Sequence, residues 1–246
     1  MSDGSIDSTS SDGITVVTIN RPAKRNAMNA GMCDDLRRAW EVFRDSDDRV
    51  AILRAEGSTF TAGADLSNPP SQFWKAVPDV GIDIGKPVIA VVQGPVVGMG
   101  VAMVAFCDLC VASSDSKFIY PEAKVGVAAG LISALVARIP HKIALELILL
   151  GEPIPAQRAY EVGLVNRLTA PGAQMEEAMH MASVMTTAAP LVLKFLKKMT
   201  YETLPRSPIE TMYRAQQQAE QVALSADARE GLLAFKEKRS PAFKGI

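Results

Sequence analysis

The stretch Val88-Ile89-Ala90-Val91-Val92-Gln93-Gly94-Pro95-Val96-Val97-Gly98-Met99-Gly100 decides the fold of this chain of 246 residues. Its first five residues form a continuous apolar run, which a strand needs when both of its faces are buried. Gln93-Gly94-Pro95 and Gly98-Met99-Gly100 then interrupt an apolar region that continues to Val111. Because these glycines and the proline break the pattern of a membrane-spanning helix, the stretch predicts a buried strand, a turn and a buried helix.

The residues before this stretch predict a helix between two buried strands. Val50-Ala51-Ile52-Leu53 is another short apolar run, and Asn29 is a candidate N-cap ahead of it. The apolar residues after Asn29 recur at helical spacing, at Met32, Cys33, Leu36, Trp40 and Phe43. Helices placed between strands imply mostly parallel pairing, so the predicted fold class is α/β.

The opening of the chain predicts a β-hairpin, and a later segment predicts an irregular loop. Ser11-Asp12-Gly13 has turn chemistry, and the β-branched run Ile14–Ile19 follows it. Residues 66–85 contain Asn68-Pro69-Pro70 and Pro78 with little periodicity, which indicates a mobile loop or a short broken helix.

The second half of the chain is predicted to become helical. A short helix over Pro155–Val162, ended by Gly163, precedes a final strand at Leu164-Val165. Ser207-Pro208-Ile209-Glu210 combines an N-cap, a proline at the first helical position and a capping-box glutamate. It predicts a long helix running toward Lys236.

Composition narrows the class of partner. The chain has 26 basic and 27 acidic residues, so its net charge of -1 gives no field that would recruit nucleic acid or an anionic membrane. A small molecule is the expected partner. Three cysteines do not form a disulfide framework, and Cys107 and Cys110 are expected to be buried small hydrophobes rather than metal ligands. The polar, acidic segment from Met1 to Asp12 is neither a secretory nor a mitochondrial targeting signal, and the odd number of cysteines favours a reducing compartment, so a cytoplasmic location is expected.

Three short segments have unusual backbone requirements. Thr61-Ala62-Gly63-Ala64-Asp65-Leu66 and Gly94–Gly100 put small residues directly after predicted strands, where backbone amides can point at an anion. Two such amides could stabilise a negatively charged oxygen, although glycines after strands are often plain turns. Tyr120-Pro121-Glu122 adds a carboxylate.

Taken together and in order, the motifs closely resemble the enoyl-CoA hydratase/isomerase (crotonase) superfamily between about Gly13 and Val165. The matching segments are Asn20-Arg21-Pro22-x-x-Arg25-Asn26-Ala27-Met28-Asn29, Ala62-Gly63-Ala64-Asp65-Leu66, Lys86-Pro87-Val88-Ile89-Ala90, Gly98-x-Gly100, Cys107-Asp108, Pro121-Glu122 and Tyr160-Glu161-Val162-Gly163-Leu164-Val165. The ending Arg239–Gly245 is similar to the family's C-terminal tail that contacts coenzyme A.

The resemblance implies an architecture and a ligand. A spiral of β-β-α turns over residues 1–188 would carry the acyl-CoA site. A helical segment over residues 189–246 would serve oligomerisation, as a homotrimer or a dimer of trimers, and would contact CoA. The substrate brings the coenzyme A, so no further cofactor and no metal is implied.

The resemblance also implies roles for individual residues. The backbone amides of Ala64 and Met99 match the two donors of the family's oxyanion hole, and each such donor lowers a barrier by about 3 kcal/mol. Ala62, Asp65 and Leu66 match residues near the adenine and pantetheine, and Arg25 and Lys244 would lie near the CoA phosphates. Ala27, Ala102 and Phe243 complete the predicted binding set.

The reaction depends on which carboxylates the chain retains. Hydratases of the family act on water with two glutamates, and those positions hold Ala102 and Glu122 here. A single carboxylate beside an enolate can still move a proton from one carbon to another, so Glu122 predicts a Δ3,Δ2-enoyl-CoA isomerase. Weak hydration, decarboxylation, thioester hydrolysis and non-catalytic acyl-CoA binding stay open. Residues 127–132 replace the family's glycine-rich turn, which predicts a bulkier pocket floor.

Overall fold

The structure is a computed structural model that describes residues 4–127 and 129–246. Residues 1–3 belong to the predicted spiral core and Ala128 to the predicted pocket floor, and both lie outside the described residues. Among the described residues, no single helix is long and apolar enough to cross a membrane. Two helices, Gln174–Thr186 and Pro190–Thr203, reach that length and hydropathy only as a pair bent by 109°.

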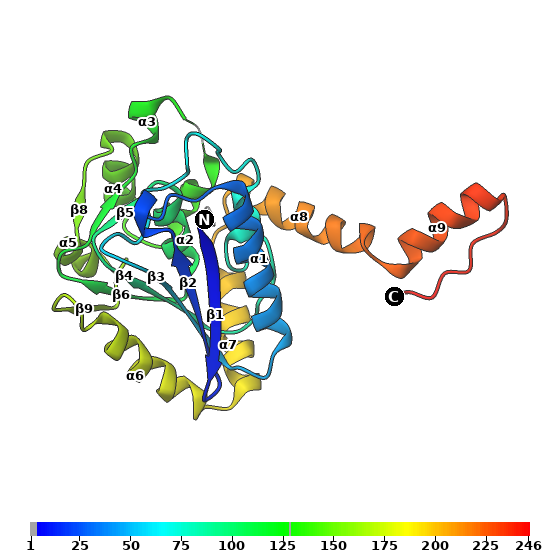
Figure 1. Cartoon of the computed structure of the whole chain (residues 1–246), viewed down its shortest axis with the longest axis horizontal. Coiled ribbons are helices and arrows are strands. Elements are labelled where there is room, and N and C mark those ends of the chain that lie inside the picture. Colours follow the sequence, from blue (N-terminus) through cyan, green and yellow to red (C-terminus); the bar gives the residue numbers. More distant parts are fainter. Residues whose placement is uncertain (1–3, 128) are drawn as a thin grey trace.

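A six-stranded sheet forms the centre of the molecule (Figure 1). Its strands are β1 (Ser5–Ser11), β2 (Ile14–Asn20), β3 (Val50–Ala55), β4 (Val88–Val92), β6 (Leu109–Ser113) and β9 (Arg167–Thr169). They lie in the order β1-β2-β3-β4-β6-β9, and every neighbouring pair except the antiparallel β1-β2 hairpin is parallel. Asp12 and Gly13 both have positive φ, as a two-residue hairpin turn requires. The predicted hairpin and parallel sheet are confirmed.

A second, three-stranded sheet lies beside the first and carries the glycine-rich turn. It contains β5 (Pro95–Val97), β7 (Lys117–Ile119) and β8 (Ile154–Pro155) in the order β5-β7-β8. The predicted turn after Val92 is therefore interrupted by a short strand before the helix begins.

Helices cover the sheets and extend the chain. The α-helices are α1 (Ala30–Asp45), α2 (Met99–Phe106), α3 (Glu122–Val125), α4 (His141–Leu145), α5 (Ala156–Glu161), α6 (Gln174–Thr186), α7 (Pro190–Thr203), α8 (Pro208–Ala223) and α9 (Ala226–Glu237). Three 3₁₀ helices, η1 (Pro22–Lys24), η2 (Phe73–Ala76) and η3 (Gly130–Ala137), and one π-helix, η4 (Glu146–Leu150), complete the set.

The two faces of the central sheet are buried against different helices. One face packs with α1, whose buried residues include Leu36, Trp40 and Phe43. The other face packs with α6 through Ala178 and Ala182. Strands β3 and β4 thus bury both faces, which explains their continuous apolar sequences.

The C-terminal helices leave the body of the molecule one after the other. Figure 1 shows α7 along the body, α8 starting at it and α9 held well away from it. Ser207 caps α8, because its side chain accepts a hydrogen bond from Glu210 N. Ser225 caps α9 in the same way through Ala228 N.

Two predicted boundaries were wrong. The predicted long helix toward Lys236 ends at Ala223, because Ser225 begins a separate helix. The final strand is β9 rather than Leu164-Val165, whose side chains are buried in the connection before it. For segment 66–85, the alternative of a short broken helix is confirmed by η2, and the residues after it are anchored in the core through Val77, Val80 and Ile82.

Candidate active site

The first candidate amide belongs to Ala64, in the turn that follows Thr61. The carbonyl of Gly63 accepts a hydrogen bond from Met28 N at 2.8 Å, and Asp65 N donates to Met28 O at 2.8 Å. Because the carbonyl and the N–H of one trans peptide point in opposite directions, the Ala64 N–H points away from Met28. Gly63 has a φ of +94°, which an L-residue rarely adopts and which makes this turn possible.

The second candidate amide belongs to Met99, the first residue of α2. Gly98 precedes it with a φ of +56° and a ψ of -118°, a backbone conformation open only to glycine. The Gly98 carbonyl accepts from Val101 N inside the helix, so the Met99 N–H points out of the helix N-terminus. Within residues 4–127 and 129–246, neither the Ala64 N–H nor the Met99 N–H has a hydrogen-bond acceptor.

The two turns lie side by side. Thr61 pairs with Val96 of β5 in a parallel bridge, with Thr61 N donating to Pro95 O and Val97 N donating to Thr61 O. A Cβ placed on Gly63 would lie 3.3 Å from Val97 O, so the two backbones are in close contact. The fold therefore brings together two free amides from segments more than thirty residues apart in sequence.

The carboxylate of Glu122 lies against the second turn. β7 runs parallel to β5, and Gly98 N donates to Ile119 O at 2.8 Å, which places the next residues of the chain over Gly98. A Cβ placed on Gly98 would lie only 2.6 Å from Glu122 Oε1. Glu122 Oε2 is buried and has no hydrogen-bond partner among the described residues. Desolvation by burial raises the pKa of Glu122 to about 7.

Ala102 lies one helical turn into α2 and is 3% exposed. It offers a methyl group where the family's hydratases have a second glutamate. A carboxyl group whose pKa lies near neutral pH, as that of Glu122 does, can both accept and return a proton.

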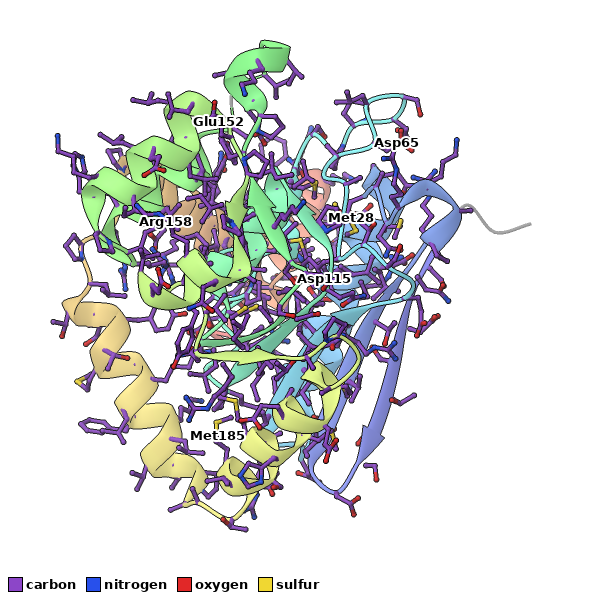
Figure 2. The ribbon with its side chains drawn as sticks, turned by 90° about the vertical axis from the view of Figure 1, so that its left-hand side faces the viewer. Met28, Asp65, Asp115, Glu152, Arg158 and Met185 are labelled. Atoms are coloured by element: carbon purple, nitrogen blue, oxygen red, sulfur yellow. The ribbon has the colours of Figure 1, made fainter. Side chains whose placement is uncertain are left out.

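The predicted residue Asp65 forms a structural contact. Its carboxylate accepts a hydrogen bond from Arg21 Nη1 at 2.7 Å and also bonds the hydroxyl and amide of Ser67. Ser67 first and Arg21 second hold the pKa of Asp65 well below its usual range. Figure 2 shows Asp65 on the loop above the buried Met28. These contacts of the Asp65 carboxylate fix the loop that follows Ala64.

The other predicted contacts near the first turn form one rim. Ala62 N donates to Arg25 O at 2.8 Å, and Ala27 O accepts from Arg21 Nη1 at 2.9 Å. The side chain of Arg25 is exposed, and Leu66 is 72% exposed. Arg25 and Leu66 therefore offer exposed side chains close to the first turn.

Phe243 and Lys244 do not join this group in a single chain. They belong to the tail after α9, and Figure 1 shows that α9 and this tail stand away from the body of the molecule. Asp227 of α9 holds the tail by accepting from Lys244 N at 2.7 Å and Gly245 N at 2.8 Å, and Glu230 accepts from Ala242 N at 2.8 Å. Phe243 is 61% exposed.

Two residues that shape the site were missed as functional positions. Asn26 is fully buried, and its amide donates to Glu56 O and Thr59 O, both at 2.7 Å. The Thr61 hydroxyl donates to Asn26 O and accepts from Gly63 N. Asn26 stands in a matching motif, but nothing in its spacing signals that it ties three loops together.

A cavity of about 520 Å³ lies elsewhere, between α7 and the body. Its walls include Cys107, Asp108 and Lys197 but none of the predicted site residues. Cys107 and Cys110 are buried free thiols whose pKa burial raises, which confirms the prediction that they act as small core residues. In the described part of the chain, no three side chains of His, Cys, Asp or Glu are grouped to hold a metal ion.

Comparison with known proteins identifies the family of the chain. The family model described as enoyl-CoA hydratase/isomerase matches residues 9–246. Enoyl-CoA hydratase EchA19 of Mycobacterium tuberculosis is 34% identical over 93% of this chain and 92% of its own length. The 2,3-dehydroadipyl-CoA hydratase of Escherichia coli is 30% identical over 94% of this chain and 95% of its own.

Solved structures show the same fold. A crystal structure of enoyl-CoA hydratase from Mycobacterium tuberculosis has a TM-score of 0.75 and 35% identity, covering 98% of this chain and 99% of that one. An enoyl-CoA hydratase/isomerase from Pseudoalteromonas atlantica has a TM-score of 0.76 and 29% identity, covering 97% and 99%.

The fold and the paired turns define an enzyme of the crotonase class, which acts on acyl-CoA thioesters. Within that class, the chain belongs to the enoyl-CoA hydratase/isomerase family. The predicted family and the α/β crotonase fold are thereby confirmed.

Proposed function

We propose that the chain is an enoyl-CoA isomerase that moves a double bond from the Δ3 to the Δ2 position of an acyl-CoA. The observation that carries this proposal is the burial of one carboxylate, Glu122, against the Gly98 turn, with an alanine at position 102. Adding water requires a second group to orient the water molecule, whereas moving a proton between carbons requires one group only.

Each step of the proposed reaction uses a group of this chain. Glu122 removes a proton from C2 of the 3-enoyl thioester, and the electron pair moves onto the thioester oxygen to form an enolate. The N–H groups of Ala64 and Met99 donate to that oxygen, and each lowers the barrier by about 3 kcal/mol. Protonated Glu122 then returns the proton to C4 as the enolate collapses, which leaves a conjugated C2–C3 double bond.

Ultraviolet spectroscopy tests the proposal through the conjugated thioester band. With 3-enoyl-CoA substrates the band should rise, and Glu122→Gln should abolish the rise while CoA affinity is kept. The rate should increase with pH through about 7, because Glu122 must be deprotonated to act as a base. Glu152→Gln, at an exposed position, is the matched control. A band that does not change while the ester still binds would reject the isomerase.

Hydration is the second candidate, because the relatives named above are hydratases. A hydratase would make the band of a 2-enoyl-CoA fall, since water removes the conjugation. Ala102→Glu would add the missing carboxylate and raise that rate if its absence is the main block. An unchanged rate in a folded variant would point to the bulkier residues at positions 127–132 instead.

The arm formed by α9 and its tail supports a proposed homotrimer or dimer of trimers. Leu232 and Phe235 on α9 are 67% and 84% exposed, which is costly for large apolar side chains in water. Phe243 and Lys244 are held at the end of the same arm. We expect them to meet the CoA of a neighbouring copy rather than that of their own chain.

A further inference from the structure

Glu122, the proposed proton-transfer group, belongs to a helix that is too short to fix the orientation of its side chain. Helix α3 is four residues long, and its N-cap residue Pro121 makes no side-chain hydrogen bond. The residues that follow Glu122, from Ala123 to Val127, are exposed. A single isolated turn of helix is not stable in water, so the orientation of Glu122 must be fixed by contacts from outside α3.

Tyr120 provides such a contact at the base of this loop. Its side chain is buried, and its hydroxyl donates a hydrogen bond of 2.8 Å to Ala129 O, on the far side of α3. The backbone at Tyr120 is seated against Gly151, where an added Cβ would lie 3.0 Å from Tyr120 O. The hydrogen bond from the Tyr120 hydroxyl to Ala129 O therefore joins the two ends of the loop that carries Glu122.

A second, weaker tether supports the same loop from its outer side. Lys124 Nζ donates to Gly151 O at 3.1 Å. Burial first and the charge of Glu122 second raise the pKa of Tyr120, so its hydroxyl stays protonated and can donate the hydrogen bond to Ala129 O.

We propose that Tyr120 is a positioning residue for Glu122: its hydrogen bond to Ala129 O closes the α3 loop and holds the carboxylate over the Gly98 turn. The inference rests on the proposed role of Glu122 as a proton-transfer group. Without the hydroxyl, the loop can open and the carboxylate can leave its place. A misplacement of about 1 Å lowers a rate by up to about a hundredfold.

The test compares Tyr120→Phe with Tyr201→Phe. Tyr201 is the matched control, since its hydroxyl also donates to a backbone carbonyl, that of Phe106, but beneath α7. The reaction is exchange of the C2 protons of butyryl-CoA for deuterium, followed by NMR, which needs the base and the enolate but no double bond. Tyr120→Phe should lower kcat about tenfold to a hundredfold with KM changed less than about twofold, while Tyr201→Phe keeps kcat.

Amide hydrogen exchange of the peptide covering residues 121–127 gives a readout without turnover. It should accelerate in Tyr120→Phe and stay unchanged in Tyr201→Phe. If Tyr120→Phe does not fold, Lys124→Met removes the second tether and should lower kcat in the same direction by a smaller factor.

The outcomes separate the two proposals. Wild-type protein that exchanges C2 protons but does not shift a double bond would reject the isomerase and still test the role of Tyr120. A wild-type kcat in Tyr120→Phe, an equal loss in Tyr201→Phe, or no exchange by the wild-type protein would each overturn the positioning role.

Discussion

The burial of Glu122 lowers the stability of the folded protein when its carboxyl group is ionised. Burial raises the pKa of Glu122 to about 7, above the value of about 4.3 for a free glutamate. Between these two values the folded protein keeps a proton that the unfolded chain has lost. The stability contributed by this group is therefore complete below about pH 4 and is lost as the pH rises through about 7.

Glu122→Gln should remove this dependence on pH. We expect the variant to gain thermal stability relative to the wild-type protein at about pH 8 and to gain little or nothing at about pH 5. Thermal unfolding of both proteins at the two pH values, with Glu152→Gln as the control, measures the difference. A gain of equal size at both pH values would mean that the charge of Glu122 is not desolvated in the folded state.

The substitution Gly98→Ala tests whether the Gly98 turn and the Glu122 carboxylate act together in catalysis. In Gly98→Ala, the new Cβ would lie 2.6 Å from Glu122 Oε1, at a φ of +56°. We expect kcat to fall by about a hundredfold, since both the carboxylate and the Met99 amide must move. Gly172→Ala is the matched control, because Gly172 also has a positive φ but has no atom within 4 Å of the added Cβ. Equal activity in the two variants would separate the turn from catalysis.

The sequence predicted the residues that touch the site better than those that support it. Gly63, Gly98 and Glu122 stand out because small residues follow strands and a carboxylate follows a proline. Asp65 shows the limit of such reasoning. Its pairing with Arg21 joins positions 44 apart in the chain, and only the folded backbone brings them within 2.7 Å.

Among the elements, α7 is joined to the body by one buried cation. Lys197 Nζ lies 2.7 Å from both Asp79 Oδ2 and Asp108 Oδ2 and donates to Lys86 O at the same distance. The side chains of Lys197 and Asp79 are each 8% exposed. Lys197→Met would leave two buried carboxylates unpaired, and breaking a buried pair costs about 3–5 kcal/mol.

Chemical denaturation of Lys197→Met should show a loss of stability in that range. Lys198→Met is the comparison, since Lys198 and Glu202 form an exposed pair whose side chains are 67% and 50% exposed. Such pairs contribute about 0–1 kcal/mol. A similar small loss in both variants would show that the buried cluster adds no net stability.

Element boundaries were predictable where a local signal marks them. The sequence predicts Asn29 and Ser207 as N-caps, and both side chains accept the expected amide hydrogen bond. Ser225 carries the same signal but lies inside an otherwise helical composition, so the break between α8 and α9 was missed. The strand β5 was missed because three residues are too few for a periodicity, and its pairing with β7 is a long-range contact.

At the scale of the whole molecule, the exposed apolar side chains of the arm predict self-association. Phe235→Glu places a charge in the proposed interface and should shift the protein from a trimer, or a multiple of it, toward the monomer. Light scattering coupled to size-exclusion chromatography measures the mass. Val42→Glu on α1 is the control, because Val42 is 69% exposed but belongs to the body. A wild-type protein that is already monomeric would remove the proposed interface.

The paired amides also bear on how new reactions can arise on this fold. Because the Ala64 and Met99 donors belong to the main chain, no substitution other than one to proline can delete them. The side chains at positions 102 and 122 can then change one at a time, while the two backbone amides continue to stabilise the enolate in the proposed mechanism. Single substitutions at these positions can therefore change the reaction while the proposed oxyanion hole is kept.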